Sequence, residues 1–288
     1  MTAITSGTPR PSEIASGWLT FLLALSCGLI VANIYYAQPL IGPISAELGL
    51  SPRSAGLIVS MTQFGYGVGL LLIVPLGDLI ENRRLVLSVI GLGALALLGA
   101  ALSTTAIQFL AAALLIGVGS VGVQILIPYA GHMAPEAIRG RVVGNVATGL
   151  MIGVMVSRPL SSFIAAISSW HVVYDASAAA MVVLALVLRR MLPARMPLAR
   201  LSYGNLLGSM VHLARTTPVL RRRALYQACL FGAFSLFWTI VPLLLAGPAF
   251  HFSQSGIALF ALAGVAGAVA APIAGRVAAG RGPRRRSR

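Results

Sequence analysis

Arg158 has the most unusual position of any residue that could do chemistry, because its guanidinium lies in the middle of an apolar run and is followed by Pro159. A charged group at the centre of a bilayer costs about 2.5 kcal/mol or more, so Arg158 is expected to face a cavity or a polar partner. Proline also frees a backbone carbonyl one turn back, which the guanidinium or a water could use. Two interpretations stay open. Arg158 binds an anion or another polar part of a substrate, or it extends to the outer interface, about ten residues or ~15 Å away.

Amides and aromatic side chains at helical spacing form a second group of candidates. Residues three apart share a helix face, and one further set follows the i, i+4, i+7, i+11 stripe. If these side chains point inward, they would line an adaptable cavity for a small molecule. Taken singly, each is explained as easily by packing or by hydrogen bonds between helices. The candidate cavity residues besides Arg158 are Asn33, Tyr36, Gln63, Tyr66, Gln124, Gln227, Phe231, Phe234 and Trp238.

Enzymatic and metal chemistry find no support in the sequence. Ser120 stands between glycines, but no histidine within the apolar runs could activate it as a nucleophile. No His, Cys and Asp cluster has metal-ligand spacing, and no phosphate-binding loop is present. Cys27 and Cys229 lie in apolar runs and are expected to be packing residues. We therefore predict a protein that is not an enzyme and holds no metal or cofactor.

The composition indicates that the solvent of this chain is lipid. Of its 288 residues, 58% are hydrophobic and only 9% are charged, whereas soluble domains carry about 25% charged residues. The net charge of +15 comes from arginines alone. Nearly all of them lie between or beyond apolar runs, where membrane topology places them. The charge therefore predicts a polytopic membrane protein and not a nucleic-acid-binding one.

Eight apolar runs approach the ~20 residues that a membrane-spanning helix needs. An Arg-rich and proline-containing segment separates the sixth from the seventh, and it is expected to hold one surface helix at 203–214. We predict an all-α membrane protein, with a six-helix bundle followed by two helices of a second bundle. The predicted helices are 17–38, 54–76, 85–102, 106–130, 142–167, 172–188, 224–246 and 253–274. The predicted segments are an N-terminal segment 1–16, a six-helix bundle 17–188, a linker 189–223, a partial second bundle 224–275 and a basic tail 276–288.

The distribution of arginine predicts the orientation. One side collects the N-terminal segment, the hairpins after the second and fourth runs, the linker and the tail, whereas the other side has Arg53 alone. The positive-inside rule then places both termini in the cytoplasm. The first apolar run is too long for the core of a signal peptide, so it is expected to be a retained helix.

Glycines four residues apart predict where helices approach closely. Gly65 and Gly69 form one such pair, and Gly149 and Gly153 form another. Small residues at this spacing let two helix backbones meet. With 31 glycines in the chain, some pairs arise by chance, so the pattern alone is weak.

The charged hairpin at 75–84 carries a family motif. It contains Leu76-Gly77-Asp78 and then Arg83-Arg84, with Val74 before them and Glu81 between them. This resembles the G-x-L-a-D-r-x-G-r-k loop of the major facilitator superfamily, with Val74 and Glu81 where that loop has glycine. The run 33–40, Asn-Ile-Tyr-Tyr-Ala-Gln-Pro-Leu, resembles a signature of the bacterial drug- and metabolite-efflux branch of that superfamily.

Arg139-Gly140 and Trp170 also suit that branch, and the resemblance covers about residues 17–275. It implies two six-helix bundles that close in turn around a central cavity. It further implies a monomeric carrier in the bacterial inner membrane that exports a small molecule, with a proton as coupling ion. No Asp or Glu lies deep within a predicted helix, so the sequence does not indicate which residue would carry that proton. The resemblance also implies a conformational-switch loop made of Gly77, Asp78, Arg83, Arg84 and Arg139.

Eight helices are fewer than the twelve of that fold. A partial repeat of the hairpin motif lies at 272–285, at the end of the eighth run. Ala279 stands there at the position expected to be acidic. The residues after it are mostly Gly, Arg, Pro and Ser, which is typical of a shifted reading frame in GC-rich DNA. These observations lead to the expectation of a shortened chain. They leave two functions open: an exporter that works by alternating access, and a remnant that inserts into the membrane but does not transport.

Overall fold

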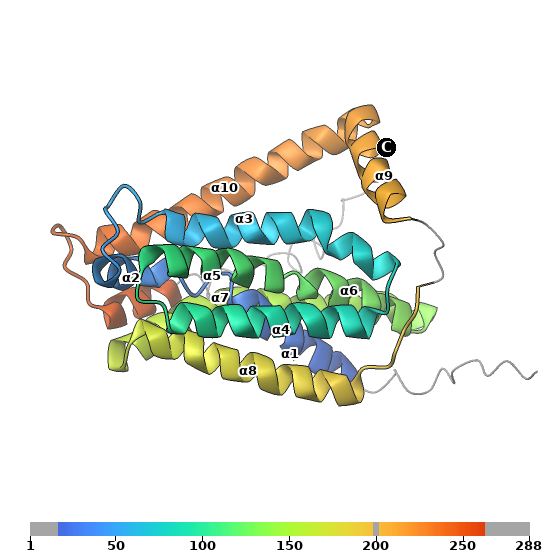
Figure 1. The fold of residues 1–288 in the computed structure, drawn as a ribbon, viewed down its shortest axis with the longest axis horizontal. Helices are drawn as coiled ribbons and strands as arrows, with labels where there is room; N and C mark the ends of the chain where they lie inside the picture. Colours follow the sequence, from blue (N-terminus) through green and yellow to red (C-terminus); the bar gives the residue numbers. More distant parts are fainter. Residues whose placement is uncertain (1–16, 198–201, 263–288) are drawn as a thin grey trace, which may run out of the picture.

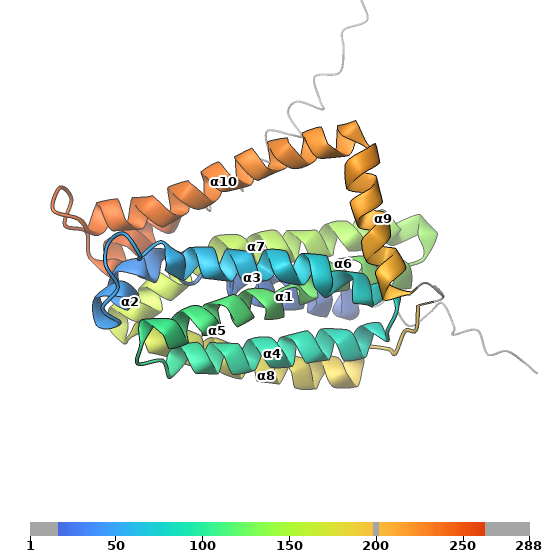
Figure 2. The same cartoon turned by 45° about the horizontal axis from the view of Figure 1, so that its top comes forward.

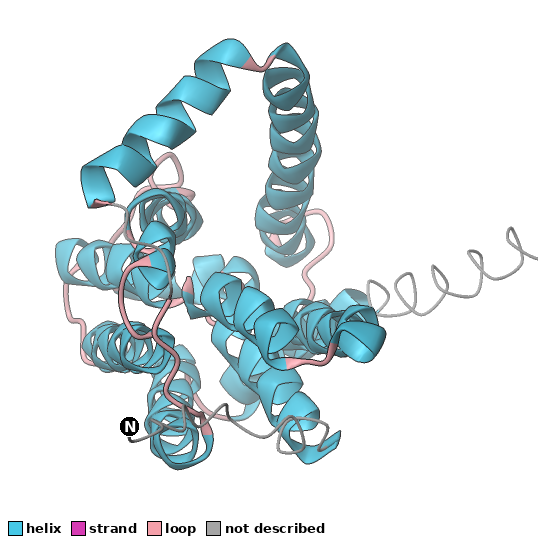
Figure 3. Cartoon of the chain, turned by 90° about the vertical axis from the view of Figure 1, so that its right-hand side faces the viewer, coloured by secondary structure: helices cyan, strands magenta, loops and turns pink. Residues whose placement is uncertain are grey.

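The described part of the chain is helical. The computed structural model describes residues 17–197 and 202–262, and within these ranges it contains helices and loops and no strand (Figure 3). The helices are α1 (Gly17–Ala32), η1 (Gln38–Leu40), α2 (Ile41–Glu47), α3 (Leu57–Leu72), η2 (Val74–Asp78), α4 (Asn82–Ala101), α5 (Ala106–Gly119), α6 (Gly122–Met133), η3 (Glu136–Ile138), α7 (Arg139–Ile167), α8 (Trp170–Met191), α9 (Tyr203–Thr216) and α10 (Pro218–Ala246). A further helical segment, 254–262, ends the described part.

Six stretches of helix are long and apolar enough to cross a membrane, and α1 is a shorter apolar helix. This confirms the predicted all-α membrane fold. The six stretches are Leu57–Asp78, Asn82–Ala101, Ala106–Met133, Glu136–Ile167, Trp170–Met191 and Pro218–Ala246. The predicted eighth helix, 253–274, lies partly outside the described residues.

Several predicted helices have other bounds in the structure; the seventh, for example, begins at Pro218 and not at Ala224, within the predicted linker. The first ends at Ala32 and not at Gln38, and the chain continues through turns to η1. Pro39 has no amide hydrogen, so it cannot bond the carbonyl of Tyr35 and continue an α-helix through this segment. The predicted helix 106–130 is divided at Ser120 and Val121 into α5 and α6. Glycines flank this break, and glycine weakens a helix interior.

The helices pack in pairs along the long axis of the molecule (Figures 1 and 2). The most extensive contacts join α1 to α7, α3 to α5, and α4 to both α5 and α8, while α6 packs against α7 and α1. One continuous apolar core runs between these helices. The pair α1–α7 matters most for the candidate site, because α7 carries Arg158 and the turns after α1 lead to Gln38.

Backbone contacts at glycine hold two of these pairs together, as the sequence predicts. A Cβ atom at Gly149 would collide with the backbone of Ala24, and one at Gly153 would collide with the backbone of Gly28. In the other pair, a Cβ atom at Gly65 would collide with the backbone of Leu114. Because no side chain separates these backbones, the register of α1 on α7 is fixed.

Helix α10 differs from the bundle helices in its surroundings. It contacts η1 and α2 at one end, diverges from the bundle along its length, and meets α9 at the other end (Figures 1 and 2). Pro242 is its only fully buried residue in the described structure. Helix α10 is therefore attached to the bundle mainly at the end that carries η1.

The glycine contact between α1 and α7 can be tested by a single methyl group. We expect Gly153→Ala to lower the free energy of unfolding by about 1–3 kcal/mol, the usual cost of overpacking, because the new Cβ meets the Gly28 backbone. Thermal unfolding of the protein in detergent would measure the change.

Gly144→Ala is the matched control, since it lies on the same helix and its Cβ would meet nothing within 4 Å. Alanine is favoured over glycine in a helix by about 1 kcal/mol, so this variant should unfold at the same or a higher temperature. Equal destabilisation of the two variants would contradict the backbone contact.

Candidate functional site

Arg158 lies in the interior of the protein with only 4% of its surface exposed. Its Nε donates a hydrogen bond to Oε1 of Gln38, at 2.6 Å, and its Nη1 donates to the carbonyl oxygen of Val154, at 2.8 Å. Pro159 leaves the carbonyl of Met155 without its helical partner. The carbonyl that Arg158 uses is that of the preceding residue, Val154. The burial of Arg158 is incompatible with the interpretation that its side chain extends to the interface.

Three aromatic rings surround the guanidinium. Its Cζ lies 4.6 Å from the ring centre of Tyr35, 5.0 Å from that of Phe234 and 4.5 Å from that of Trp238. Tyr35 and Phe234 also meet edge to face, with centres 6.4 Å apart. Each cation–π contact contributes about 0.5–2 kcal/mol, more when water is excluded. These rings therefore offset part of the cost of keeping the charge away from water.

The charge of Arg158 has no carboxylate partner among the described residues. The ion pairs found there join Glu81 to Arg84 and Glu47 to His171. Four buried polar atoms in the described structure also lack a hydrogen-bond partner: Nη2 of Arg158, Nε2 of Gln38, Nε2 of Gln63 and Oγ of Ser235. Leaving such a group unsatisfied costs about 1–3 kcal/mol, so the free donors of Arg158 and Gln38, whose side chains are bonded to each other, are suited to a polar ligand or to water.

Four predicted cavity residues lie at helical spacing on α10, and only the two nearest the bundle reach Arg158. Phe234 and Trp238 contact the guanidinium, and Phe231 stacks on Phe234 with ring centres 6.1 Å apart while 39% of it stays exposed. Gln227, one turn further along, is exposed. The divergence of α10 from the bundle explains why the stripe separates in this way.

A second contact between α7 and the chain beyond α10 lies close to Arg158 in the sequence. The hydroxyl of Ser162 donates a hydrogen bond of 2.8 Å to the backbone carbonyl of Gln254. Arg158 and Ser162 are four residues apart and therefore lie on one face of α7. This face joins the first bundle to the segments that follow the linker.

The run 33–40 presents its side chains in two directions. Asn33 accepts a hydrogen bond from the hydroxyl of Ser177 in α8, and Tyr36 lies beside the same serine. Tyr35 and Gln38 point instead toward Arg158. Both pairs are three residues apart, so spacing alone could not distinguish them, and the predicted cavity set did not include Tyr35 and Gln38.

The candidates of α3 and α6 form a separate contact. Nε2 of Gln124 donates a hydrogen bond of 3.0 Å to the hydroxyl of Tyr66, which joins the two helices. Gln63, one turn before Tyr66, is half-buried and keeps its amide nitrogen unpartnered. The structure thus brings Arg158, Phe231, Phe234 and Trp238 together, and it places the other candidates around them or apart.

Comparison with known proteins identifies the family to which these helices belong. Residues 20–288 match the family model of the Major Facilitator Superfamily. The chain belongs to the Major Facilitator Superfamily. It is 40% identical over 250 residues to the uncharacterized transporter YgaY of Escherichia coli O157:H7, an alignment that covers 87% of this chain and 64% of the relative. It is 35% identical over 269 residues to the probable transporter SCO4007 of Streptomyces coelicolor, with 92% of this chain and 62% of the relative covered.

A solved structure shares the fold. It is a bacterial homologue of the human lysosomal transporter Spinster, in an inward-facing and unoccupied conformation, and it matches 88% of this chain and 59% of its own with a TM-score of 0.63 at 14% identity. The chain therefore spans somewhat less than two thirds of the length of these Major Facilitator Superfamily proteins.

The loop that carries the superfamily motif lies at what we call the basic end of the bundle, defined by Arg83, Arg84, Arg139 and Arg189. Within the described structure this loop contacts the segment after α8 and helix α9. Nη1 of Arg195 donates to Oδ1 of Asn82 at 3.0 Å, and the backbone N–H of Asn82 donates to the carbonyl of Arg195 at 3.1 Å. Arg83 donates to the carbonyl of Leu192 at 3.3 Å.

The other predicted switch residues have different surroundings. The carbonyl of Gly77 accepts a 2.6 Å hydrogen bond from the side chain of Asn82, and Arg84 is paired with Glu81 at 2.8 Å on the surface. Asp78 is exposed and forms no ion pair with a described residue, and Arg139 is an exposed first residue of α7. Gly77 and Asp78 line a cavity of about 390 Å³ between η2, α6 and α9.

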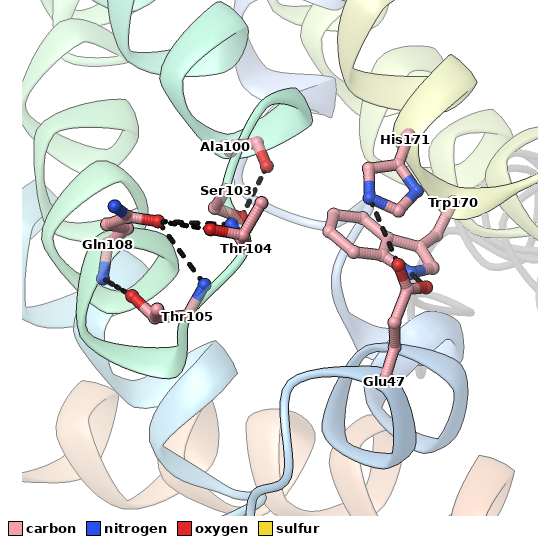
Figure 4. Close-up of polar contacts among 8 residues, drawn as sticks. All are labelled: Glu47, Ala100, Ser103, Thr104, Thr105, Gln108, Trp170 and His171. Atoms are coloured by element: carbon pink, nitrogen blue, oxygen red, sulfur yellow. Dashed lines mark hydrogen bonds and ion pairs between the residues drawn. The ribbon is translucent and has the colours of Figure 1, made fainter.

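At the end of the bundle opposite the basic end, Glu47 of α2 contacts the first turn of α8. Its carboxylate accepts a 2.6 Å hydrogen bond from the indole of Trp170 and lies 3.4 Å from Nε2 of His171 (Figure 4). The imidazole of His171 stacks on Trp170 with ring centres 3.6 Å apart. This contact ties α2, which follows directly on Gln38, to the first turn of α8.

The contacts at the basic end predict how the segment 192–195 is protected. We expect Asn82→Ala to release this segment, because it removes the side-chain acceptor for Arg195 and the donor to Gly77. Trypsin should then cleave after Arg195 faster in the folded protein, as followed by mass spectrometry of the fragments.

Arg84→Gln is the control. It removes an exposed ion pair, a kind of contact that is worth about 1 kcal/mol or less, and it leaves Asn82 in place. Cleavage after Arg195 should be unchanged in this variant. Unchanged cleavage in Asn82→Ala as well would contradict the role given to these hydrogen bonds.

Proposed function

We propose that this chain belongs to a carrier that exports a small molecule by alternating access, with Arg158 at the substrate site. One observation carries this proposal: a buried cation, with no counter-ion among the described residues, lies where the first bundle meets α10. In a two-bundle carrier, the substrate site lies near the bilayer midplane between the bundles. Intramembrane charges of this kind are by default functional.

Membrane topology supports the proposed location and orientation. The arginine-rich loops gather at the basic end, which the positive-inside rule assigns to the cytoplasm. We propose a multipass protein of the bacterial inner membrane with both termini in the cytoplasm. The resemblance of the run 33–40 to the efflux branch supports export as the direction, and a proton is the proposed coupling ion.

The second candidate is a membrane protein that inserts but does not transport. Alternating access requires two bundles. In the described structure, the membrane-length helix α10 alone follows the linker, together with the shorter segment 254–262. This observation is the reason to test the second candidate beside the first.

Export by the 288-residue chain distinguishes the two candidates. Cells that express it would be loaded with carboxyfluorescein, ethidium or Nile red, which differ in charge, and the loss of each dye would be followed. We expect faster loss of at least one dye than from cells without the chain, and an uncoupler that collapses the proton gradient should abolish the difference.

Arg158→Gln should abolish the export while leaving the amount of protein in the membrane unchanged, because it removes the buried charge. Arg53→Gln is the matched control, since it makes the same substitution at an exposed position in the loop before α3. Dye loss equal to that of cells without the chain for all three dyes would support the non-transporting candidate. Full export by Arg158→Gln would remove Arg158 from the substrate site.

A further inference from the structure

We propose that the site at Arg158 binds the carboxylate group of an organic anion, held between Nη2 of Arg158 and Nε2 of Gln38. The proposal rests on the proposed function only in identifying this site with the substrate site. It names the chemical class of the ligand and a recognition residue, Gln38, that the spacing of polar residues does not indicate.

The hydrogen bond between Gln38 and Arg158 leaves one amide group without a partner. The Nε of arginine is a donor only, so it must face the carbonyl oxygen of the Gln38 side chain and not its nitrogen. The amide nitrogen of Gln38 therefore takes no part in this hydrogen bond. Gln38 is fully buried and its nitrogen has no partner in the described structure, so it is a donor without an acceptor.

The second free donor is Nη2 of Arg158. In a guanidinium group, Nε and Nη2 lie on one edge of the planar fork. Nε donates to Oε1 of Gln38, so each free donor belongs to the same planar group as one atom of that hydrogen bond. A carboxylate has two acceptor oxygens and is the group that such paired donors recognise best.

The charge of the site also favours an anion. Arg158 is buried, and none of the described carboxylates forms an ion pair with it. Interactions between charges are stronger in the protein interior than in water. A single negative charge would balance the site, whereas a neutral or cationic ligand would leave the guanidinium uncompensated.

The aromatic residues indicate what is attached to the carboxylate. Phe234 and Trp238 face the guanidinium, and Phe231 continues this aromatic surface away from it while remaining 39% exposed. An inorganic anion would contact only the donors. An organic carboxylate with an apolar or aromatic body would also cover this surface.

The test is a binding measurement on the purified 288-residue chain in detergent by calorimetry. The probes are indole-3-acetate, indole-3-acetamide and tryptamine, which share a ring and carry a negative, no and a positive charge, together with chloride and phosphate. We expect indole-3-acetate to bind at least about tenfold more tightly than any other probe, a difference of ~1.4 kcal/mol.

Gln38→Glu is the decisive variant, because it places a carboxylate against the guanidinium without changing the size of the side chain. We expect it to raise the unfolding temperature of the ligand-free protein and to weaken indole-3-acetate binding about tenfold or more. Gln108→Glu makes the same change at an exposed helix start where the carbonyl oxygen already accepts from Thr104 and Thr105, and it should leave binding unchanged.

Three outcomes would overturn the proposal: no binding of indole-3-acetate, equally tight binding of the amide or amine, or unchanged binding in Gln38→Glu. The dye-export experiment is independent of this result. Carboxylate binding without export would leave the site intact and refute the exporter. Export of ethidium or Nile red without carboxylate binding would refute the carboxylate site and support the exporter.

Discussion

The guanidinium of Arg158 is held away from water by described helices that supply no carboxylate to balance it. In lipid, every polar group must find its partner within the protein, and here the partners come from three separate elements. Helix α7 offers its own carbonyl at Val154, η1 offers the amide of Gln38, and α10 offers the faces of two aromatic rings. The charge of Arg158 therefore constrains where η1 and α10 lie, because no one of these three elements supplies all of its partners.

The glycine contacts explain how two of these elements keep their positions. Gly149 and Gly153 let α7 lie directly on the backbone of α1, at Ala24 and Gly28. The turns after Ala32 then carry Tyr35 and Gln38 over to Arg158, because the chain leaves the helix before Pro39. Glu47 anchors the following helix, α2, to Trp170. The close contact between α1 and α7 and the hydrogen bond between Glu47 and Trp170 together fix the positions of Gln38 and Arg158.

Much of this fold can be predicted from the sequence, because in lipid an apolar run of sufficient length has little choice but to be a helix. The sequence context of Arg158 leaves two positions open, the interior and the outer interface, and the structure decides between them. The direction of the side chains in the run 33–40 does not follow. Asn33 with Tyr36 and Tyr35 with Gln38 have the same spacing, and the turns that decide between them depend on tertiary contacts. The separation of Gln227 from Phe234 likewise depends on the angle of α10, which no local pattern encodes.

The attachment of α10 at one end has a mechanical consequence. Trp238 and Pro218 are twenty residues apart on a helix that rises 1.5 Å per residue, so about 30 Å separate the guanidinium contact from the first turn of α10. A rotation of about 10° around the contact with η1 would therefore move that first turn by ~5 Å, while the rings at the site would shift by only a fraction of this distance. The helix converts small adjustments around one charge into a large displacement next to α9, at the far end of the molecule.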